Sequence, residues 1–214
     1  MLGREAVNGL YDYFATKYGG EDSIKFQEAR NNFVKSMAAY SVISYLLQLK
    51  DRHNGNIMID DAGHIIHIDF GFCFDIAPGG ITFERAPFKL TSEMIAVMGG
   101  SQESQPYHWF EELCVKAFLA CRPYADKLAA CVKVMSASGW VFDTEFFLWR
   151  LLLTRPRLPC FKPDTIQNFK DRLVLDKNEK EAADFMKSLV KKSYSSYSTK
   201  GYDQFQLLTN GIPY

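Results

Sequence analysis

An asparagine and an aspartate at the two ends of a short apolar stretch are the residues with the clearest potential for chemistry. Asn56 closes the polar loop 51–56, and Asp69 is followed directly by a phenylalanine and a glycine. If the stretch between them folds back as a hairpin, the amide oxygen and the carboxylate come close together. Hard oxygen ligands that leave room for water and phosphate oxygens suit Mg²⁺, and phosphoryl transfer needs this positioning and charge neutralisation. His53 could accept a hydroxyl proton or stabilise charge on a moving phosphate.

Each of these residues has an ordinary structural interpretation when it is taken alone. The tripeptide 69–71, Asp-Phe-Gly, occurs by chance in many proteins, and a single histidine such as His53 is more often a surface residue than a catalyst. Asn56 before a strand is also typical of a turn or a cap. The functional interpretation therefore depends on the combination of helix, polar loop, hairpin and tripeptide. His64 and His67 lack such support, and we interpret them as structural residues.

The elements around these residues are predicted by periodicity. Apolar residues recur at three- and four-residue steps from about 22 to 50 without a proline, which indicates a helix. Two β-branched runs, 57–59 and 64–68, flank an Asp-Asp-Ala-Gly turn and predict a hairpin. Residues 72–92 contain Pro-Gly-Gly and a further proline, so we expect an extended loop, whereas residues 1–20 mix apolar and polar residues and end in Gly-Gly. Further helices are expected over 91–98, 106–120, 123–136, 162–171, 177–194 and 200–209.

Length and composition predict one globular domain of the α+β class, mainly helical. The 214 residues are 47% hydrophobic, which is enough for a substantial core. Lys plus Arg and Asp plus Glu number 25 each, so the basic excess of nucleic-acid binders is absent and no nucleic-acid partner is expected. The five cysteines form no CxxC pair, which, without a signal peptide, favours reduced thiols in the cytosol. The longest apolar run, 146–153, is far shorter than the roughly 20 residues of a membrane-spanning helix, so membrane contact should be peripheral.

The candidate catalytic motifs of the sequence resemble those of a known family. Residues 51–58, Asp-Arg-His-Asn-Gly-Asn-Ile-Met, followed by 67–71, His-Ile-Asp-Phe-Gly, are similar to the catalytic domain of the phosphatidylinositol 3-/4-kinase family. Protein kinases order the corresponding loop His-Arg-Asp, whereas Asp-Arg-His with an asparagine close behind is the lipid-kinase arrangement. The resemblance is strongest to type III alpha phosphatidylinositol 4-kinases and implies the C-terminal lobe of a protein-kinase-like catalytic domain. It extends over most of the chain through residues 33–40, 63–72, 78–80, 89–91, 98–100 and 212–214.

The resemblance implies a role for each matching catalytic residue. His53 would be the base or would stabilise the transition state. Asp51 would be a catalytic carboxylate that organises the loop. Asn56 and Asp69 would ligate Mg²⁺ beside the phosphates of ATP. Met58, with Ile68, would form the apolar floor beneath adenine.

Residues 72–92 would be the activation loop that contacts the lipid headgroup, with Arg85 and Lys89 as its cations. Between 72 and 91 these two are offset by one Asp and one Glu. Phosphorylated headgroups need several Arg or Lys partners, so a neutral loop favours unphosphorylated inositol, although any solvated loop can be neutral. The 4-hydroxyl as the attacked position follows from the resemblance alone.

The last segment, residues 202–214, carries apolar residues such as Phe205 and Leu208 beside few charges, with lysines shortly upstream. Two interpretations stay open. The segment could be an amphipathic helix on an anionic membrane surface, or a helix that packs into the core.

Two features depart from the family pattern. Nothing before residue 51 fits the phosphate-covering loop and the strand lysine of an N-terminal lobe, so we expect residues 1–214 to be a partial catalytic domain. Residues 140–157 interrupt a junction that is nearly direct in the family. We interpret them as an atypical insertion, either a retained intron or a lineage-specific helix.

The leading hypothesis is a lipid kinase that uses ATP and Mg²⁺ to phosphorylate the 4-hydroxyl of phosphatidylinositol in membranes. The alternatives are a catalytically inactive truncated module and a protein Ser/Thr kinase of the related family. By resemblance, the full protein would be cytoplasmic and peripheral at the plasma membrane, where scaffold or regulatory subunits would recruit it.

Overall fold

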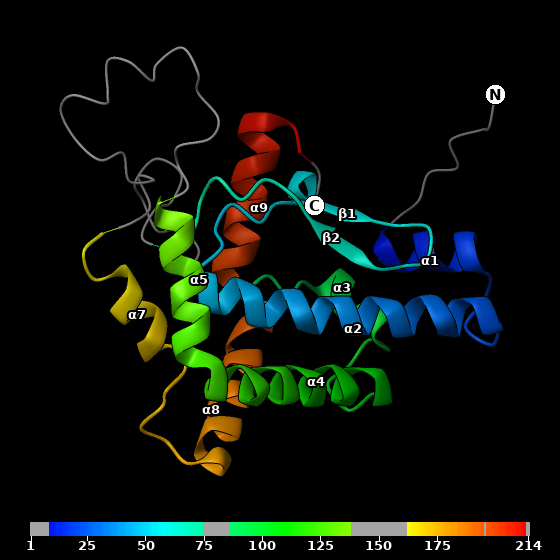
Figure 1. The fold of residues 1–214 in the computed structure, drawn as a ribbon. Coiled ribbons are helices and arrows are strands. Elements are labelled where there is room, and N and C mark those ends of the chain that lie inside the picture. The colour runs from blue at the N-terminus through cyan, green and yellow to red at the C-terminus, as the bar shows by residue number, and fades with distance from the viewer. Residues whose placement is uncertain (1–8, 75–85, 138–161, 195, 213–214) are drawn as a thin grey trace.

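The computed structural model describes residues 9–74, 86–137, 162–194 and 196–212. Within these residues the fold is mainly helical with one small antiparallel hairpin beside the helices (Figure 1). This confirms the α+β, mainly helical class expected from the sequence. The first half contains α1 (Leu10–Tyr18), α2 (Ile24–Leu47), η1 (Asn54–Asn56), β1 (Ile57–Ile59), β2 (Ile65–His67) and α3 (Ser92–Val97). The second half contains α4 (Gln105–Cys121), η3 (Arg122–Tyr124), α5 (Ala125–Ala137), α7 (Thr165–Asp171), α8 (Glu179–Ser193) and α9 (Tyr197–Asn210).

Helix α2 is the central element of the described fold. It lies along α4 on one side and carries α1 and β2 on another (Figure 1), which explains why Phe33 and Val34 in its middle are fully buried. It begins where Ser23 Oγ accepts a hydrogen bond from the Phe26 backbone N at 3.1 Å, a standard N-cap arrangement. It ends at Gln48, whose left-handed backbone donates from N to the Ser44 carbonyl. The chain is thereby delivered directly into the polar loop.

Helix α1 is an element that the sequence pattern did not predict. Phe14 and Tyr18, one helical turn apart, are its buried residues. The Phe14 ring packs edge-on against Phe33 of α2, with 5.5 Å between ring centroids. The helix ends at Gly19, which has φ +89°, at the Gly-Gly pair that the sequence marks as a breaker. Its single apolar stripe is too short to stand out as a periodicity among mixed residues.

The hairpin forms where the sequence predicts it. Strands β1 and β2 pair antiparallel with Met58 opposite Ile66. Asp60 Oδ1 closes the turn by accepting from the backbone N of Ala62 at 2.9 Å and of His64 at 2.8 Å. Gly63 has φ +90°, and a Cβ there would lie 2.8 Å from the carbonyl oxygen of Ala29. The turn therefore needs glycine to sit close against α2.

The later helices begin and end within a few residues of the predicted ranges. Helix α8 has a capping box in which Asn178 Oδ1 accepts from the Glu181 backbone N at 2.9 Å and Glu181 accepts from the Asn178 backbone N. The predicted insertion 140–157 lies outside the described residues. Among the helices that the structure describes, none combines the length and the apolar character needed to cross a membrane.

Candidate active site

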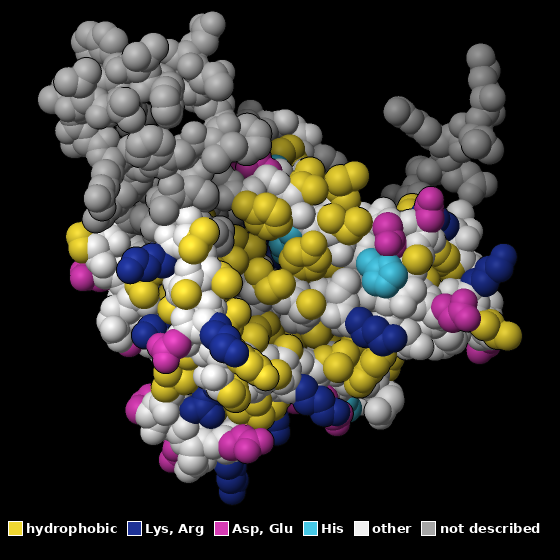
Figure 2. All heavy atoms as spheres, in the orientation of Figure 1, with side chains coloured by type: hydrophobic (Ala, Val, Ile, Leu, Met, Phe, Trp, Pro, Cys, Tyr) yellow, Lys and Arg dark blue, Asp and Glu magenta, His cyan; other side chains and the backbone are white. Residues whose placement is uncertain are grey.

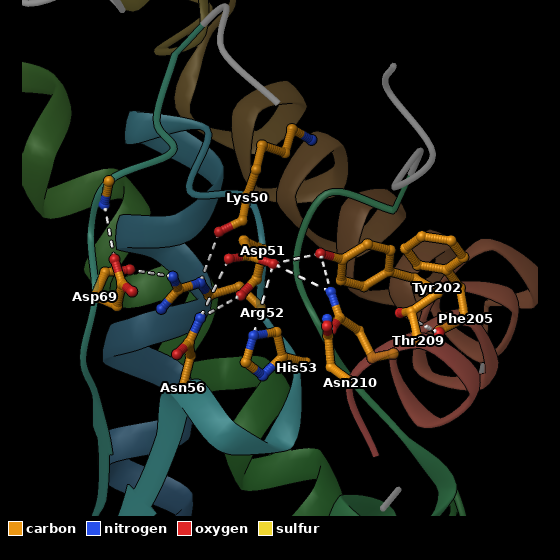
Figure 3. Close-up of polar contacts among 12 residues, drawn as sticks. Lys50, Asp51, Arg52, His53, Asn56, Asp69, Tyr202, Phe205, Thr209 and Asn210 are labelled. Atoms are coloured by element: carbon orange, nitrogen blue, oxygen red, sulfur yellow. Dashed lines mark hydrogen bonds and ion pairs between the residues drawn. The ribbon is translucent and has the colours of Figure 1, made fainter. Parts of the chain in front are cut away.

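The hairpin brings Asn56 and Asp69 close together. The backbone N of Ile68 donates to the carbonyl of Asn56 at 3.0 Å, so Asn56 lies beside the residue that precedes Asp69. Figure 3 shows Asn56 and Asp69 on the same side of Asp51. The Asn56 side-chain nitrogen donates to the Asp51 carbonyl at 2.9 Å. The amide nitrogen is therefore engaged, and the amide oxygen is the atom that can ligate a metal. Asp69 is exposed, and its Oδ1 accepts from the Gly71 backbone N at 3.2 Å.

These residues fit the chemistry of a magnesium site. In the described part of the chain no three His, Cys, Asp or Glu side chains gather to hold a metal. An ion at the hairpin would have one amide oxygen and one carboxylate from the protein, with its other positions open to water and phosphate. Mg²⁺ is commonly bound in this way, through one or two protein ligands and substrate phosphates. Ligation by Asn56 and Asp69 stays a prediction.

Both candidate carboxylates occupy a backbone conformation that is uncommon for residues other than glycine. Asp51 has φ +63° and Asp69 has φ +55°. Left-handed backbone at a non-glycine residue costs free energy and persists only where the surroundings enforce it, and such residues cluster at functional sites. Gln48, Phe74 and Val174 also have positive φ, so the conformation alone does not identify a site, and the roles of Asp51 and Asp69 stay predictions.

His53 faces the carboxylate of Asp51 across the loop (Figure 3). Its Nε2 lies 3.7 Å from Asp51 Oδ1, and both side chains are largely buried. Burial lowers the pKa of His53 below its usual value, and the neighbouring Asp51 opposes that shift without cancelling it. His53 is therefore neutral near pH 7, the state in which an imidazole can accept a proton.

Arg52 connects the polar loop to the segment that carries Asp69, a role that the sequence pattern did not single out. Its guanidinium is buried and donates to the carbonyls of Lys50 at 2.9 Å, of Ile68 at 2.8 Å and of Asp69. Three backbone carbonyls from two segments thus accept hydrogen bonds from the same guanidinium. Because arginine offers several donors in a fixed geometry, it can hold the loop and the Asp-Phe-Gly segment in one arrangement.

The outward face of the hairpin is apolar. Met58 and Ile68, the predicted floor beneath adenine, are both exposed, as are Ile66 and Phe70. Met58 lies opposite Ile66 in the hairpin. Ile68, just after β2, is two residues beyond Ile66, so the three side chains are expected on the same face. Figure 2 shows hydrophobic side chains gathered on this side of the molecule. An exposed apolar patch of this kind indicates a binding surface, and contact with adenine stays a prediction.

The structure assigns Lys89 to a partner other than the headgroup. Its Nζ lies 2.6 Å from Asp203 Oδ1 of α9, and the lysine side chain is only 1% exposed. Burial in this pair disfavours contact between the Lys89 ammonium and a solvent-side ligand, and substrate contact by Lys89 stays a prediction. Arg85, the other predicted cation, lies outside the described residues.

Helix α9 contributes polar residues that the sequence analysis missed. The Tyr202 hydroxyl donates to Asp51 Oδ1 (Figure 3), and Gln206 Nε2 approaches the same oxygen at 3.5 Å. Tyr202, Asp203 and Gln206 are all buried. Gln206 follows Asp203 by three residues and Tyr202 by four, which places all three on one face of a helix. This spacing of polar residues is the sequence signal from which they could have been predicted. The apolar residues of the same segment lie on its exposed face instead, as Phe205 and Leu208 show.

His67, interpreted from the sequence as structural, is buried between the hairpin and α2. Its ring stacks on Tyr40 of α2, with 4.3 Å between centroids and 11° between planes. Burial lowers the pKa of His67 to about 4, so the ring is neutral at physiological pH. The stack fixes β2 against α2, two residues before Asp69.

Residues 2–142 match the protein family described as phosphatidylinositol 3- and 4-kinase. This chain belongs to that family. The loop and hairpin described above lie within the matched residues, and the mainly helical fold agrees with the C-terminal lobe of a kinase-like domain.

Individual members of the phosphatidylinositol 3- and 4-kinase family resemble the chain over its full length. It is 65% identical to phosphatidylinositol 4-kinase stt4 of Schizosaccharomyces pombe and 60% identical to phosphatidylinositol 4-kinase STT4 of Saccharomyces cerevisiae, covering 100% of this chain and 10% of each relative. It is 43% identical to the human putative phosphatidylinositol 4-kinase alpha-like protein P2, again over 100% of this chain and over 34% of that protein. The chain thus spans about a tenth of the length of the two yeast relatives.

Proposed function

We propose that this chain carries the catalytic loop and metal-binding segment of an enzyme that transfers the γ-phosphate of ATP to the 4-hydroxyl of phosphatidylinositol. One observation carries the proposal. Asp51, His53, Asn56 and Asp69 occupy one loop-and-hairpin unit in a chain that is 65% identical, from end to end, to a protein named as a phosphatidylinositol 4-kinase. The choice of the 4-hydroxyl rests on the names of the relatives.

The residues of the loop suit the steps of such a transfer. His53, neutral and beside Asp51, would take the proton of the inositol hydroxyl as that oxygen attacks the γ-phosphorus, while the bond from γ-phosphorus to the β-γ bridging oxygen breaks and ADP leaves. Asp51 would orient the imidazole and stabilise it once it is charged. Asn56 and Asp69 would hold Mg²⁺, which neutralises charge on the phosphates and holds them for attack. The apolar face at Met58 would lie against the adenine ring and exclude water there.

The loop that would meet the headgroup offers little positive charge. Lys89 is bound to Asp203, which leaves Arg85 as the other Lys or Arg residue between positions 72 and 91. An inositol that already carries phosphates would need several cations. We therefore propose unphosphorylated phosphatidylinositol as the substrate, with headgroup contact through Arg85 rather than Lys89.

Neutralising both members of the Lys89–Asp203 pair tests this assignment. In the complete protein, the double variant Lys89→Met with Asp203→Asn is expected to keep the KM for phosphatidylinositol within about twofold, because neither side chain meets the lipid. The single change Lys89→Met leaves a buried carboxylate unpaired and should reduce stability by about 3 kcal/mol or more. Thermal unfolding and steady-state kinetics on lipid vesicles measure the two effects. A large rise in KM for the stable double variant would return Lys89 to the headgroup site.

The outer face of α9 favours peripheral contact with a membrane over packing into the core. Phe205 is 48% exposed and Leu208 is 77% exposed, whereas the buried face of the helix is polar. Exposed lysines of α8, including Lys191 and Lys192, precede this helix along the chain. Apolar residues with nearby lysines suit an anionic bilayer surface. We propose that the full protein is cytoplasmic and is recruited to the plasma membrane. The proposal that scaffold subunits recruit it rests on the family resemblance.

Replacing Phe205 and Leu208 by serine separates membrane contact from catalysis. The double variant is expected to lose at least tenfold in activity on anionic vesicles, since full burial of one apolar side chain contributes roughly 1.5–3 kcal/mol and a tenfold loss corresponds to about 1.4 kcal/mol. Activity on detergent-dispersed phosphatidylinositol should fall less, because Leu208 is 77% exposed and Phe205 reaches the loop only indirectly, through its ring stack on Tyr202. Leu175→Ser, at another half-exposed leucine, serves as the matched control. Equal losses on both substrate forms would refute the membrane role.

A substrate panel tests the proposed function. The complete protein is incubated with labelled ATP, Mg²⁺ and, in separate reactions, phosphatidylinositol, phosphatidylinositol 4-phosphate and a Ser/Thr peptide. We expect label only on phosphatidylinositol, at the 4-position by chromatographic comparison with isomer standards. Label on the peptide would favour a protein kinase, and label at another hydroxyl would correct the position. No transfer to any acceptor by the folded protein would favour a non-catalytic module.

A further inference from the structure

Helix α9 buries its polar side rather than an apolar one. Thr199, Tyr202, Asp203 and Gln206 are its buried residues, while the leucine at position 208 is exposed. A helix that only completes a fold buries an apolar stripe, because burial of polar groups is costly unless they are hydrogen-bonded. The buried face of α9 therefore needs partners, and it finds them at the catalytic loop.

A line of hydrogen bonds runs along this face to Asp51. Asn210 Nδ2 donates to Gln206 Oε1 at 2.6 Å, and Gln206 Nε2 donates to the Tyr202 hydroxyl at 2.7 Å. The Tyr202 hydroxyl in turn donates to Asp51 Oδ1. The three α9 residues follow one another at intervals of four, so the line uses one stripe of the helix. Figure 3 shows Tyr202 and Asn210 on the side of Asp51 opposite to Asn56.

Helix α9 also contacts segment 86–90. Asp203 binds Lys89, and Ser198 Oγ accepts from the backbone N of Ala86 at 3.3 Å. Helix α9 thus contacts the catalytic loop through Tyr202 and the end of segment 86–90 through two other side chains. A helix that contacts both places can fix the position of Asp51 relative to segment 86–90.

Asp51 needs such support because its backbone is strained and its carboxylate has several competing partners. Its backbone is left-handed at φ +63°, a conformation with a free-energy cost. The carboxylate is shared between Tyr202, the amide nitrogen of Asn56 at 3.4 Å and the imidazole of His53 at 3.7 Å. Asp51 Oδ1 is the oxygen that both the Tyr202 hydroxyl and the His53 imidazole approach. A charge-assisted hydrogen bond of this kind is roughly twice as strong as a neutral one.

We propose that Tyr202 and Gln206 are positioning residues of the active site, which set the orientation of the Asp51 carboxylate toward His53 and Asn56. The proposal rests on the function proposed above and adds residues from the other end of the chain to it. Removing the Tyr202 hydroxyl leaves substrate-binding surfaces intact but lets the carboxylate turn away from its working position. Small misplacements of this kind reduce turnover more than binding.

The test compares two tyrosines of one helix in the complete protein. Tyr202→Phe deletes the buried hydroxyl, and Tyr197→Phe deletes the hydroxyl of a tyrosine that is 91% exposed. With phosphatidylinositol and Mg-ATP, we expect Tyr202→Phe to lower kcat by about tenfold, the usual cost of losing a hydrogen-bonding partner behind a site residue. The KM values for ATP and phosphatidylinositol should change by less than about twofold, and Tyr197→Phe should behave as wild type. Gln206→Met, which removes the second donor, should lower kcat less than Tyr202→Phe.

Hydrogen exchange across residues 197–210 separates positioning from folding. Unchanged protection of α9 in Tyr202→Phe together with reduced kcat supports the proposal. Loss of protection together with the reduced kcat, or equal kcat for Tyr202→Phe and Tyr197→Phe, overturns it. If wild type labels no phosphatidylinositol, the proposed function fails first and this inference falls with it; if wild type is active and the Tyr202 and Gln206 variants match it, only this inference fails.

Discussion

Asp69→Asn is expected to lower the rate of phosphatidylinositol phosphorylation by about a thousandfold, the upper range for losing one electrostatic group of an active site. The change keeps the shape of the side chain but removes the charge that would bind Mg²⁺. Because the backbone at Asp69 is left-handed, asparagine, which tolerates that conformation, is the least disruptive replacement. Initial rates over a Mg²⁺ titration measure the effect, and high Mg²⁺ should restore part of the lost rate.

Asp61→Asn is the matched control for this substitution. Asp61 lies in the hairpin turn, is fully exposed, and pairs only at the surface with Lys17 at 2.8 Å. An exposed pair of this kind contributes little to stability because water and salt screen it, so the variant should keep wild-type kinetics. If Asp69→Asn retained wild-type activity and Mg²⁺ dependence, the assignment of Asp69 to the metal would be wrong.

Arg52→Lys is expected to produce the second-largest loss, about a hundredfold in kcat, because a 1 Å shift of catalytic groups has effects of this size. Lysine keeps the charge but carries its donors on one nitrogen, so it cannot span the carbonyls of Lys50 and Ile68 as the guanidinium does. The carbonyls lose a charge-assisted hydrogen-bond donor, and a hydrogen bond to a charged group contributes about 1.5–3 kcal/mol. Faster hydrogen exchange over residues 65–72 should accompany the loss of activity.

Arg122 offers a control with the same architecture away from the loop. Its guanidinium donates to the carbonyls of Leu173 at 3.1 Å and Val174 at 3.0 Å, in the connection between α7 and α8. Arg122→Lys should therefore loosen that connection without changing kcat. Equal kinetic losses in the Arg52 and Arg122 variants would mean that general destabilisation, rather than the position of Asp69, explains both.

The sequence predicts the local structure of this chain well, because the relevant signals are local. The α2 periodicity, the turn chemistry of 60–63 and the capping box of α8 involve residues within a few positions of one another. The hairpin then follows, and with it the approach of Asn56 to Asp69. Helix α1 was missed because its apolar stripe, Phe14 and Tyr18, is short.

The parts of the site that could not be predicted depend on contacts between distant segments. Tyr202 meets Asp51 across 151 positions of sequence, and Lys89 meets Asp203 across 114. No periodicity encodes such a pairing, and the apolar residues of 202–214 drew attention to the opposite face of the helix. The charge of Lys89 indicated a headgroup contact because the buried partner was not visible in the local pattern.

The central claim is that Asn56 and Asp69 hold a divalent cation beside the nucleotide phosphates. Anomalous diffraction from crystals of the protein with Mn²⁺ and a non-hydrolysable ATP analogue tests it directly. We predict an anomalous peak about 2.0–2.3 Å from the Asn56 amide oxygen and an Asp69 carboxylate oxygen, slightly beyond the Mg²⁺ range. A bound nucleotide whose metal peak contacts neither residue would contradict the account.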